Sequence, residues 1–227
     1  MKWLGRLLGR SNLALDARES RRLAHWQAAR RVDLNLPLSH ARLVVVDVES
    51  SGLDLNRDRL ISIGAVAIEG GRIVLADTLD VVLQQPSESS RDNILIHGIG
   101  AGAQLSGVRA ADALLGFLEW VGNAPLLAFH ADFDQGMVDK SLRATLGVRF
   151  NHEWADLARI APAVCPEWAS RCKSLDQWTA KFGISNFARH SALADALATA
   201  QLFQALRPRL ESRRLTTFRA LQSVCPR

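Results

Sequence analysis

The sequence predicts an α/β domain in which a mixed sheet is covered by helices on its faces. Three apolar segments, at residues 43–48, 60–68 and 73–83, follow one another closely and are typical of antiparallel strands. Helical and strand patterns then alternate between residues 108 and 206. A strand meander followed by such alternation indicates a layered domain around one core, which we expect to span residues 41–207.

Composition excludes several classes of protein. With 48% hydrophobic and 22% charged residues in a chain of 227, the sequence indicates a globular fold rather than a disordered one. No apolar run approaches the roughly 20 residues of a membrane-spanning helix. Arg6 and Arg10 interrupt the apolar start before a signal sequence can form, so we expect a cytoplasmic protein. The three cysteines indicate neither a disulfide framework nor a zinc site: Cys165, Cys172 and Cys225.

Charge is distributed unevenly along the chain. Residues 1–42 carry a net charge of +6 and residues 207–227 carry +5, so the remaining segment must carry −6 within the total of +5. Basic ends can contact phosphates or an acidic partner, or can simply be solvated. An acidic core that handles a polyanion needs cations to neutralise its site.

The first 40 residues are predicted to form a basic helical extension. Asp16 and Glu19 have the spacing of a capping box at the start of a helix. Three residues then fall on one helical face: Leu23, Trp26 and Arg30. Residues 34–39, which contain Pro37, are predicted to be a linker into the domain.

Within the domain, the turn at residues 69–71 is predicted to join the second and third strands as a hairpin. We then expect a helix at 108–121, a buried strand at 125–129 and a helix at 133–146. Ser174 and Gln177 form a second capping box, for a helix that Gly183 ends. A last helix is expected at 191–206, stopping before Pro208, and residues 208–227 are expected to be a basic tail.

Two acidic residues close the first strand. Asp47 and Glu49 are two residues apart, so their side chains point to the same face of the sheet. An aspartate directly after a buried apolar strand is costly unless a cation or partner accompanies it. The alternative is a pair that simply reaches solvent at the end of the strand.

Further acids follow the buried strand at 125–129. Asp132 and Asp134 both lie near the start of the next helix, where ligands of α/β sheets usually bind. Position alone does not choose between them, and either acid could simply stabilise the positive end of the helix dipole.

His190 and Asp195 form the last pair. Their spacing of five places them on different sides of a continuous helix, so we expect His190 in the loop before the helix and Asp195 inside it. Asp195 is the only charge in the apolar stretch 192–198. A buried carboxylate of this kind is protonated, paired or metal-bound.

Together these segments resemble the DEDDh exonucleases, in particular the group typified by the proofreading epsilon subunit of bacterial DNA polymerase III. The segment 47–52, DVESSG, is similar to the first motif of the family, with serine where threonine is usual. The segment 130–134, HADFD, is similar to the second, whose metal ligand is the Asp after Phe, here Asp134. The segment 190–196, HSALADA, is similar to the third, and the segment 96–99, IHGI, is followed by Gly100 instead of the usual Thr.

The resemblance covers residues 42–206 and implies an RNase H-like fold with a mixed five-stranded sheet. It also implies two divalent metal ions, Mg²⁺ or Mn²⁺, bound by Asp47, Glu49, Asp134 and Asp195. His190 is then the general base, because the related subclass uses a tyrosine and this chain has none. The expected activity is 3′-to-5′ removal of nucleotides from DNA.

Substrate-binding residues are expected next to these motifs. The resemblance implies that residues after the first motif hold the terminal base, with glycine allowing close approach. Two histidines are further candidates for contacts with the substrate. The set is Ser50, Ser51, Gly52, Leu53, His97 and His130.

The motifs leave alternatives open. An exoribonuclease that trims RNA or short oligonucleotides would carry the same residues, and a non-catalytic nucleic-acid-binding module could retain the fold. We expect single-stranded 3′ ends as the partner and no membrane. The N-terminal extension could bind a protein, whereas the short segment after the core does not favour a stable polymerase complex.

Overall fold

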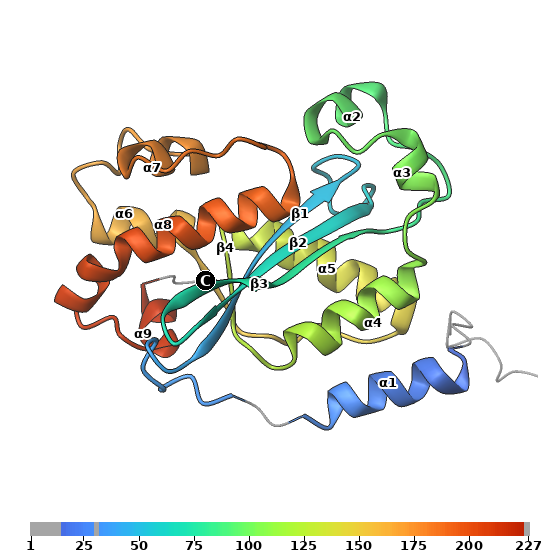
Figure 1. Ribbon diagram of the computed structural model, residues 1–227, viewed down its shortest axis with the longest axis horizontal. Helices are drawn as coiled ribbons and strands as arrows, with labels where there is room; N and C mark the ends of the chain where they lie inside the picture. Colours follow the sequence, from blue (N-terminus) through green and yellow to red (C-terminus); the bar gives the residue numbers. More distant parts are fainter. Residues whose placement is uncertain (1–14, 30–31, 225–227) are drawn as a thin grey trace, which may run out of the picture.

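One mixed sheet organises the protein. The computed structural model describes residues 15–29 and 32–224. Five strands are ordered β3-β2-β1-β4-β5, and β1 is antiparallel to β2 and parallel to β4 (Figure 1). The predicted mixed sheet, with its antiparallel meander followed by parallel strands, is confirmed.

The strand bounds agree closely with the sequence prediction. β1, β2 and β3 are joined in the predicted meander, and β4 is the predicted short buried strand. Of the described strands only β5, at the sheet edge, was not predicted, because it follows polar residues and itself ends in Asp156, so no apolar run marks it. The strands are β1 (Arg42–Ser50), β2 (Leu60–Glu69), β3 (Arg72–Val82), β4 (Leu126–Ala128) and β5 (Trp154–Asp156).

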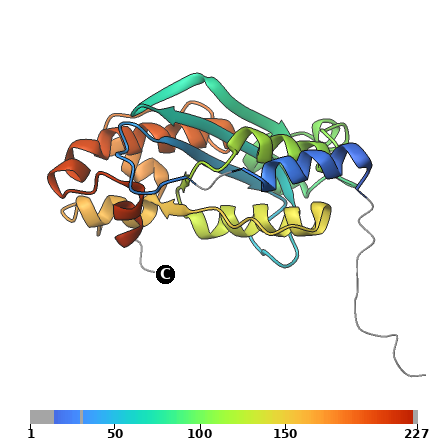
Figure 2. The same cartoon turned by 90° about the horizontal axis from the view of Figure 1, so that it is seen from below.

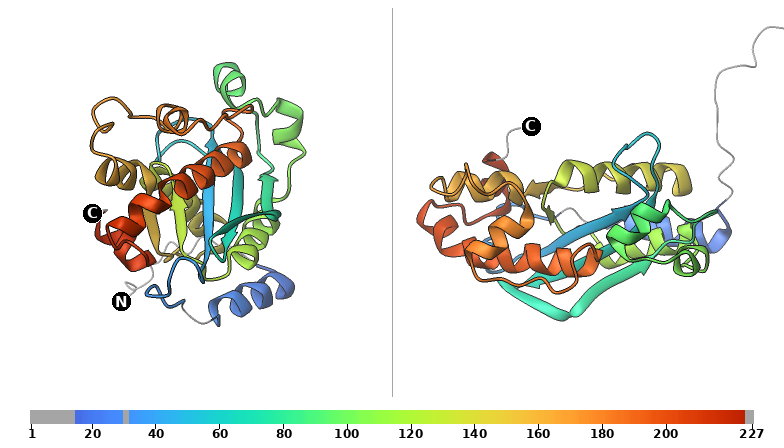
Figure 3. Two further views of the ribbon diagram at one scale, coloured as in Figure 1. Left: turned by 60° about the vertical axis from the view of Figure 1, so that its left-hand side comes forward. Right: turned by 90° about the horizontal axis from the view of Figure 1, so that it is seen from above.

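Helices cover both faces of the sheet. Alternate residues of β1 point to opposite faces: Leu43 and Val45 pack in one core cluster with residues of α6, α7, α8 and α9, whereas Val44 and Val46 pack with α4 and α5. Figures 2 and 3 show α8 and α5 in separate layers with the sheet between them.

Helix bounds confirm the longer predicted helices, and both capping boxes form. The short helices α2, α3, α6 and α9 were not predicted, whereas the equally short α7 was predicted from its capping box. The described helices are α1 (Ala17–Gln27), α2 (Arg91–His97), α3 (Ala101–Leu105), α4 (Ala110–Val121), α5 (Ala131–Leu146), α6 (Leu157–Val164), α7 (Leu175–Lys181), α8 (Ala192–Ser212) and α9 (Phe218–Ser223).

The expected stop of the last long helix before Pro208 is wrong. α8 continues through this proline to Ser212. Proline removes one helical hydrogen bond, but Leu206 and Leu210 are both buried on the same helix face, and their packing holds the last turns in place. The boundary expected at residue 207 therefore falls inside a helix, and α9 beyond it packs Phe218 into the core.

The N-terminal helix lies against the domain. Arg22 of α1 pairs with Glu119 of α4 at 2.7 Å, and the buried Glu19 pairs with Arg109. The expected linker at 34–39 is packed rather than extended, because Leu34 and Leu38 are buried in the core. Arg30, expected on one helical face with Leu23 and Trp26, lies outside the described residues, as does Cys225.

The described part of the chain has no helix that is both long enough and apolar enough to span a bilayer. Cys165 and Cys172 are buried free thiols.

Candidate metal centre

The end of β1 forms one wall of the candidate site. Asp47 and Glu49 continue the alternation of Leu43 and Val45, so their side chains point to the face that α8 covers. β4 pairs with β1 only at Val44 and Val45, which leaves the later part of β1 without a strand partner on that side. The two carboxylates therefore lie on the part of β1 that has no strand partner on the β4 side.

A glycine in β2 lets α8 approach this wall. Gly64 pairs with Asp47 across the sheet, so a side chain at Gly64 would also point toward α8. A Cβ atom placed there would lie 2.0 Å from the backbone nitrogen of Leu193 and 2.1 Å from the carbonyl carbon of Ala192. Only glycine permits this close contact between α8 and β2. As a result, Asp195 in the first turn of α8 lies next to the end of β1.

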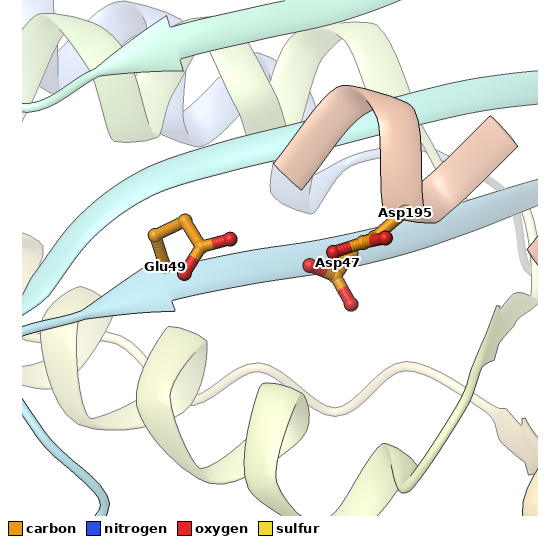
Figure 4. A group of neighbouring side chains, drawn as sticks. All are labelled: Asp47, Glu49 and Asp195. Atoms are coloured by element: carbon orange, nitrogen blue, oxygen red, sulfur yellow. The ribbon is translucent and has the colours of Figure 1, made fainter. Parts of the chain in front are cut away.

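Three carboxylates meet at this point. One oxygen from each of Asp47, Glu49 and Asp195 lies within 4.8 Å of the other two. Figure 4 shows the two β1 side chains facing the aspartate from α8. Glu49 and Asp195, which are 146 positions apart in the sequence, are thus brought together.

Asp134 reaches the same strand from the opposite layer. It lies in the first turn of α5, is 4% exposed and is not one of the three converging carboxylates. Its Oδ1 accepts a hydrogen bond from the backbone nitrogen of Val48 at 3.1 Å, on the side of β1 that β4 leaves open. Asp134 therefore holds the end of β1 and adds its charge to the cluster.

Electrostatics show how unfavourable this cluster is without a cation. Burial, followed by the charges of Asp134, Asp195 and Glu49, raises the pKa of Asp47 well above its ordinary value. Burial and Asp195 raise the pKa of Glu49 to about 8. Burial also raises the pKa of Asp134 and of Asp195. Neighbouring carboxylates that resist ionisation are a fit for hard divalent cations such as Mg²⁺ or Mn²⁺, which compensate the charge with oxygen ligands.

The loop before α8 is attached to Asp195. The backbone nitrogen of His190 donates to Asp195 Oδ2 at 2.9 Å, and the side-chain amide of Asn186 donates to Asp195 Oδ1. His190 has a left-handed backbone, with φ of 61°, and an exposed side chain. The prediction of His190 in the loop and Asp195 in the helix is confirmed.

Asp132 differs clearly from Asp134. It is exposed and pairs with Arg159 at 2.6 Å. His130, at the start of α5, has φ of 68°, and its backbone nitrogen donates to Asp156 Oδ1 at 2.9 Å, while its side chain is exposed.

The loop after β1 folds around Asp58. Ser51 Oγ donates to Asp58 Oδ1 at 2.9 Å, and the backbone nitrogen of Asp54 donates to Asp58 Oδ2 at 2.8 Å. A Cβ at Gly52 would lie 2.5 Å from Asp58 Oδ2, so a larger residue at this position would have to displace the carboxylate from these hydrogen bonds. Leu53, at the tip, is 86% exposed.

His97 is buried inside its own segment. Its Nδ1 accepts from the Ile99 backbone nitrogen at 2.9 Å, and its Nε2 lies 2.8 Å from Asn93 Oδ1. The side-chain amide of Asn93 in turn donates to the Ser50 carbonyl at 2.9 Å, and Ser50 Oγ donates to the Gly52 carbonyl. In this structure His97 supports the end of β1 through Asn93.

Sequence reasoning missed Gly64, Asp58, Asn93 and Asn186. Each acts through a contact with a residue distant in the sequence or through loop geometry, and none has a local pattern that distinguishes it from an ordinary surface or strand residue.

Comparison with known proteins identifies the family to which the chain is similar. Residues 44–203 match the family model described as exonuclease, of the RNase T type. A DNA polymerase III PolC-type protein of Thermotoga petrophila is 31% identical over 175 residues, covering 77% of this chain and 12% of that protein. A DNA polymerase III subunit epsilon-like protein of Rhodobacter capsulatus is 31% identical over 188 residues, covering 82% of this chain and 26% of that protein. The chain thus spans only a minor part of these relatives.

Solved structures support the RNase H-like fold that the motifs implied. E. coli exonuclease I in complex with a dT13 oligonucleotide aligns with a TM-score of 0.64 at 15% identity, over 77% of this chain and 42% of that one. Cell-death related nuclease 4 aligns with a TM-score of 0.65 at 11% identity, over 75% and 64%.

Proposed function

The chain belongs to the exonuclease family of the RNase T type, with the motifs of its DEDDh group, and on this premise we propose a metal-dependent 3′-to-5′ exonuclease. Its substrate is the 3′ end of single-stranded DNA, from which it releases nucleoside monophosphates by hydrolysis. The relatives are DNA polymerase III proteins, which favours DNA over RNA.

The observation that carries this proposal is the convergence of Asp47, Glu49 and Asp195 within 4.8 Å. Their raised pKa values mean that the cluster gains charge compensation when a divalent cation binds. Asp134 completes the set of four acids and holds the backbone that carries the first two. Two bound divalent ions would activate the attacking water and stabilise the leaving 3′ oxygen.

His190 accepts the proton of the attacking water. Its backbone nitrogen donates to Asp195, so the residue that carries the imidazole is attached directly to a member of the carboxylate cluster. The exposed side chain can reach a water molecule on the solvent side of the cluster. Ser50, Ser51, Gly52 and Leu53 border the terminal nucleotide, and the exposed Leu53 side chain contacts its base. His130 borders the other side, at the start of α5.

The test is a digestion of 5′-labelled single-stranded DNA, blunt duplex DNA and RNA of matched sequence with Mg²⁺, Mn²⁺ or chelator. We expect a ladder that shortens from the 3′ end of single-stranded DNA with either metal and no product with chelator. A ladder on RNA alone would replace the proposal with an exoribonuclease. Absence of hydrolysis together with tight binding would indicate a non-catalytic module. An Asp47→Ala variant purified in parallel excludes a contaminating nuclease.

The N-terminal helix remains a candidate surface for a protein partner. Its face toward α4 is already occupied by the pairs of Arg22 and Glu19, so a partner would contact the exposed side chains of α1, which include Arg18 and Arg21.

A further inference from the structure

An aromatic side chain projects into solvent beside the candidate metal centre. Phe187 is 96% exposed and lies in the loop that joins α7 to α8. The residues on either side of it are held by hydrogen bonds. Asn186 on one side donates to Asp195 and accepts from the Ala188 backbone nitrogen at 3.2 Å. His190, shortly after it, also binds Asp195. The ring is thus exposed to solvent on a loop that is hydrogen-bonded to the acidic cluster through Asp195.

The segment that contains Phe187 has a net charge opposite in sign to that of the domain as a whole. Residues 170–190 contain four basic residues and one acidic residue, a net charge of +3, whereas residues 43–206 as a whole carry −6. All four basic side chains are exposed, namely Arg171, Lys173, Lys181 and Arg189. Arg189 is paired with Asp176 at 2.6 Å, which ties the loop to α7. A basic surface with a projecting aromatic ring suits a single nucleic acid strand.

We propose that the segment 170–190 binds the single strand that leads into the candidate metal centre, and that an unpaired base stacks on Phe187. This inference rests on the proposed function and adds to it a second contact with the strand, apart from the terminal nucleotide. Figure 1 shows the loop before α8 and the helix α2 on either side of the end of β1, so the strand would enter along the α7 side. A base in a duplex has its faces covered by its neighbours, so stacking on Phe187 favours single strands.

The experiment measures binding and hydrolysis separately. Fluorescence anisotropy with Ca²⁺ gives the Kd of a labelled oligothymidylate, and the p-nitrophenyl ester of thymidine 5′-monophosphate, which has one base only, reports the chemical step. We expect Phe187→Ala to raise the Kd of the oligonucleotide about 5-fold to 150-fold, the range of one lost stacking contact. Phe187→Trp should bind as the wild type does. Hydrolysis of the small ester should not change in either variant.

Leu75→Ala is the matched control. Leu75 is 68% exposed on β3, near the end of the sheet that carries Arg72 and not the end that carries Glu49. Three results would each overturn the stacking contact. The Kd could rise equally in Leu75→Ala and Phe187→Ala, it could stay unchanged in Phe187→Ala, or it could rise as much in Phe187→Trp as in Phe187→Ala. Loss of ester hydrolysis in Phe187→Ala would show that the residue supports the loop instead of binding the strand. A wild type that binds the oligonucleotide but hydrolyses neither substrate would refute the proposed function alone, because the binding comparison remains valid.

Discussion

Gly64 and Leu193 touch backbone to backbone: a Cβ at Gly64 would lie 2.0 Å from the nitrogen of Leu193. This contact sets how closely α8 approaches β2, and Asp195 lies two residues after Leu193. We predict that Gly64→Ala pushes the first turn of α8 outward and separates Asp195 from Asp47. Metal-dependent hydrolysis should fall sharply, and Mn²⁺ affinity measured by calorimetry should weaken. The overpacking should cost about 1–3 kcal/mol, a fall in Tm of several degrees.

Gly116→Ala provides the control for that variant. Gly116 lies inside α4, and a Cβ there would meet no atom within 4 Å. Alanine favours a helix interior, so stability should rise slightly and Mn²⁺ affinity should stay the same. A Gly64→Ala protein that binds Mn²⁺ like the wild type would show that α8 is not positioned by this contact.

The sequence patterns predicted those strands and helices that are determined by residues close together in the sequence. β1, β2 and β3 follow from apolar runs and the turn at residues 69–71, and the helix starts at Asp16 and Ser174 follow from capping boxes that do form. The passage of α8 through Pro208 was not predictable, because it depends on the burial of Leu210 in the tertiary core.

In the candidate site, too, local features were predictable and the features that depend on tertiary packing were not. Spacing placed Asp47 and Glu49 on one face, and the pattern after His190 placed Asp195 in a helix. Only the resemblance chose Asp134 over Asp132, and the structure gives the physical difference, since one is buried against Val48 and the other is exposed. Whether these acids meet depends on how two layers pack on the sheet, which no single segment encodes.

Asp47→Asn should separate metal binding from folding. Asp47 is surrounded by three carboxylates, so a neutral amide of the same shape removes repulsion while keeping the packing. We expect hydrolysis to be abolished and the Tm of the metal-free protein at pH 8 to rise. Differential scanning calorimetry in chelator measures the second effect. A metal-free Asp47→Asn protein that unfolds at a lower temperature than the wild type would contradict this account of the cluster.

The stability of the metal-free protein should decrease as the pH rises. The pKa of Glu49 is raised from an ordinary 4.5 to about 8, so the folded state holds an extra proton between these values. Stability from this proton is full below about pH 4.5 and is lost as the pH rises to about 8. The Tm in chelator should therefore fall between pH 6 and pH 8, and the increase in Tm on adding Mn²⁺ should be larger at pH 8.

Glu49→Gln removes this titration and is the matched variant for the pH series. Its Tm in chelator should depend less on pH over the same interval, although Asp47, Asp134 and Asp195 still contribute. Identical pH profiles for Glu49→Gln and the wild type would show that Glu49 ionises normally.

His190→Ala should slow the chemical step without weakening the complex. General base catalysis contributes roughly 100-fold to 10,000-fold, so kcat should fall within this range while the Kd of an oligonucleotide with Ca²⁺ stays unchanged. His40→Ala, an exposed histidine before β1, is the control and should behave as the wild type does. Equal losses in kcat and in affinity would assign His190 to substrate binding.

Asn186→Ala should release the loop that carries His190. The Asn186 side chain joins Asp195 to the Ala188 backbone, and its loss leaves the His190 amide as the remaining bond between this loop and Asp195 among the contacts described. Hydrogen exchange at the amides of Ala188 and His190 should become faster, because loss of a partly buried hydrogen bond costs about 1–3 kcal/mol. The value of kcat should fall less than in His190→Ala, since the imidazole is still present. Ser185→Ala, an exposed neighbour, controls for changes in the loop sequence. Unchanged exchange at both amides in Asn186→Ala would mean that Asp195 holds the loop through His190 alone.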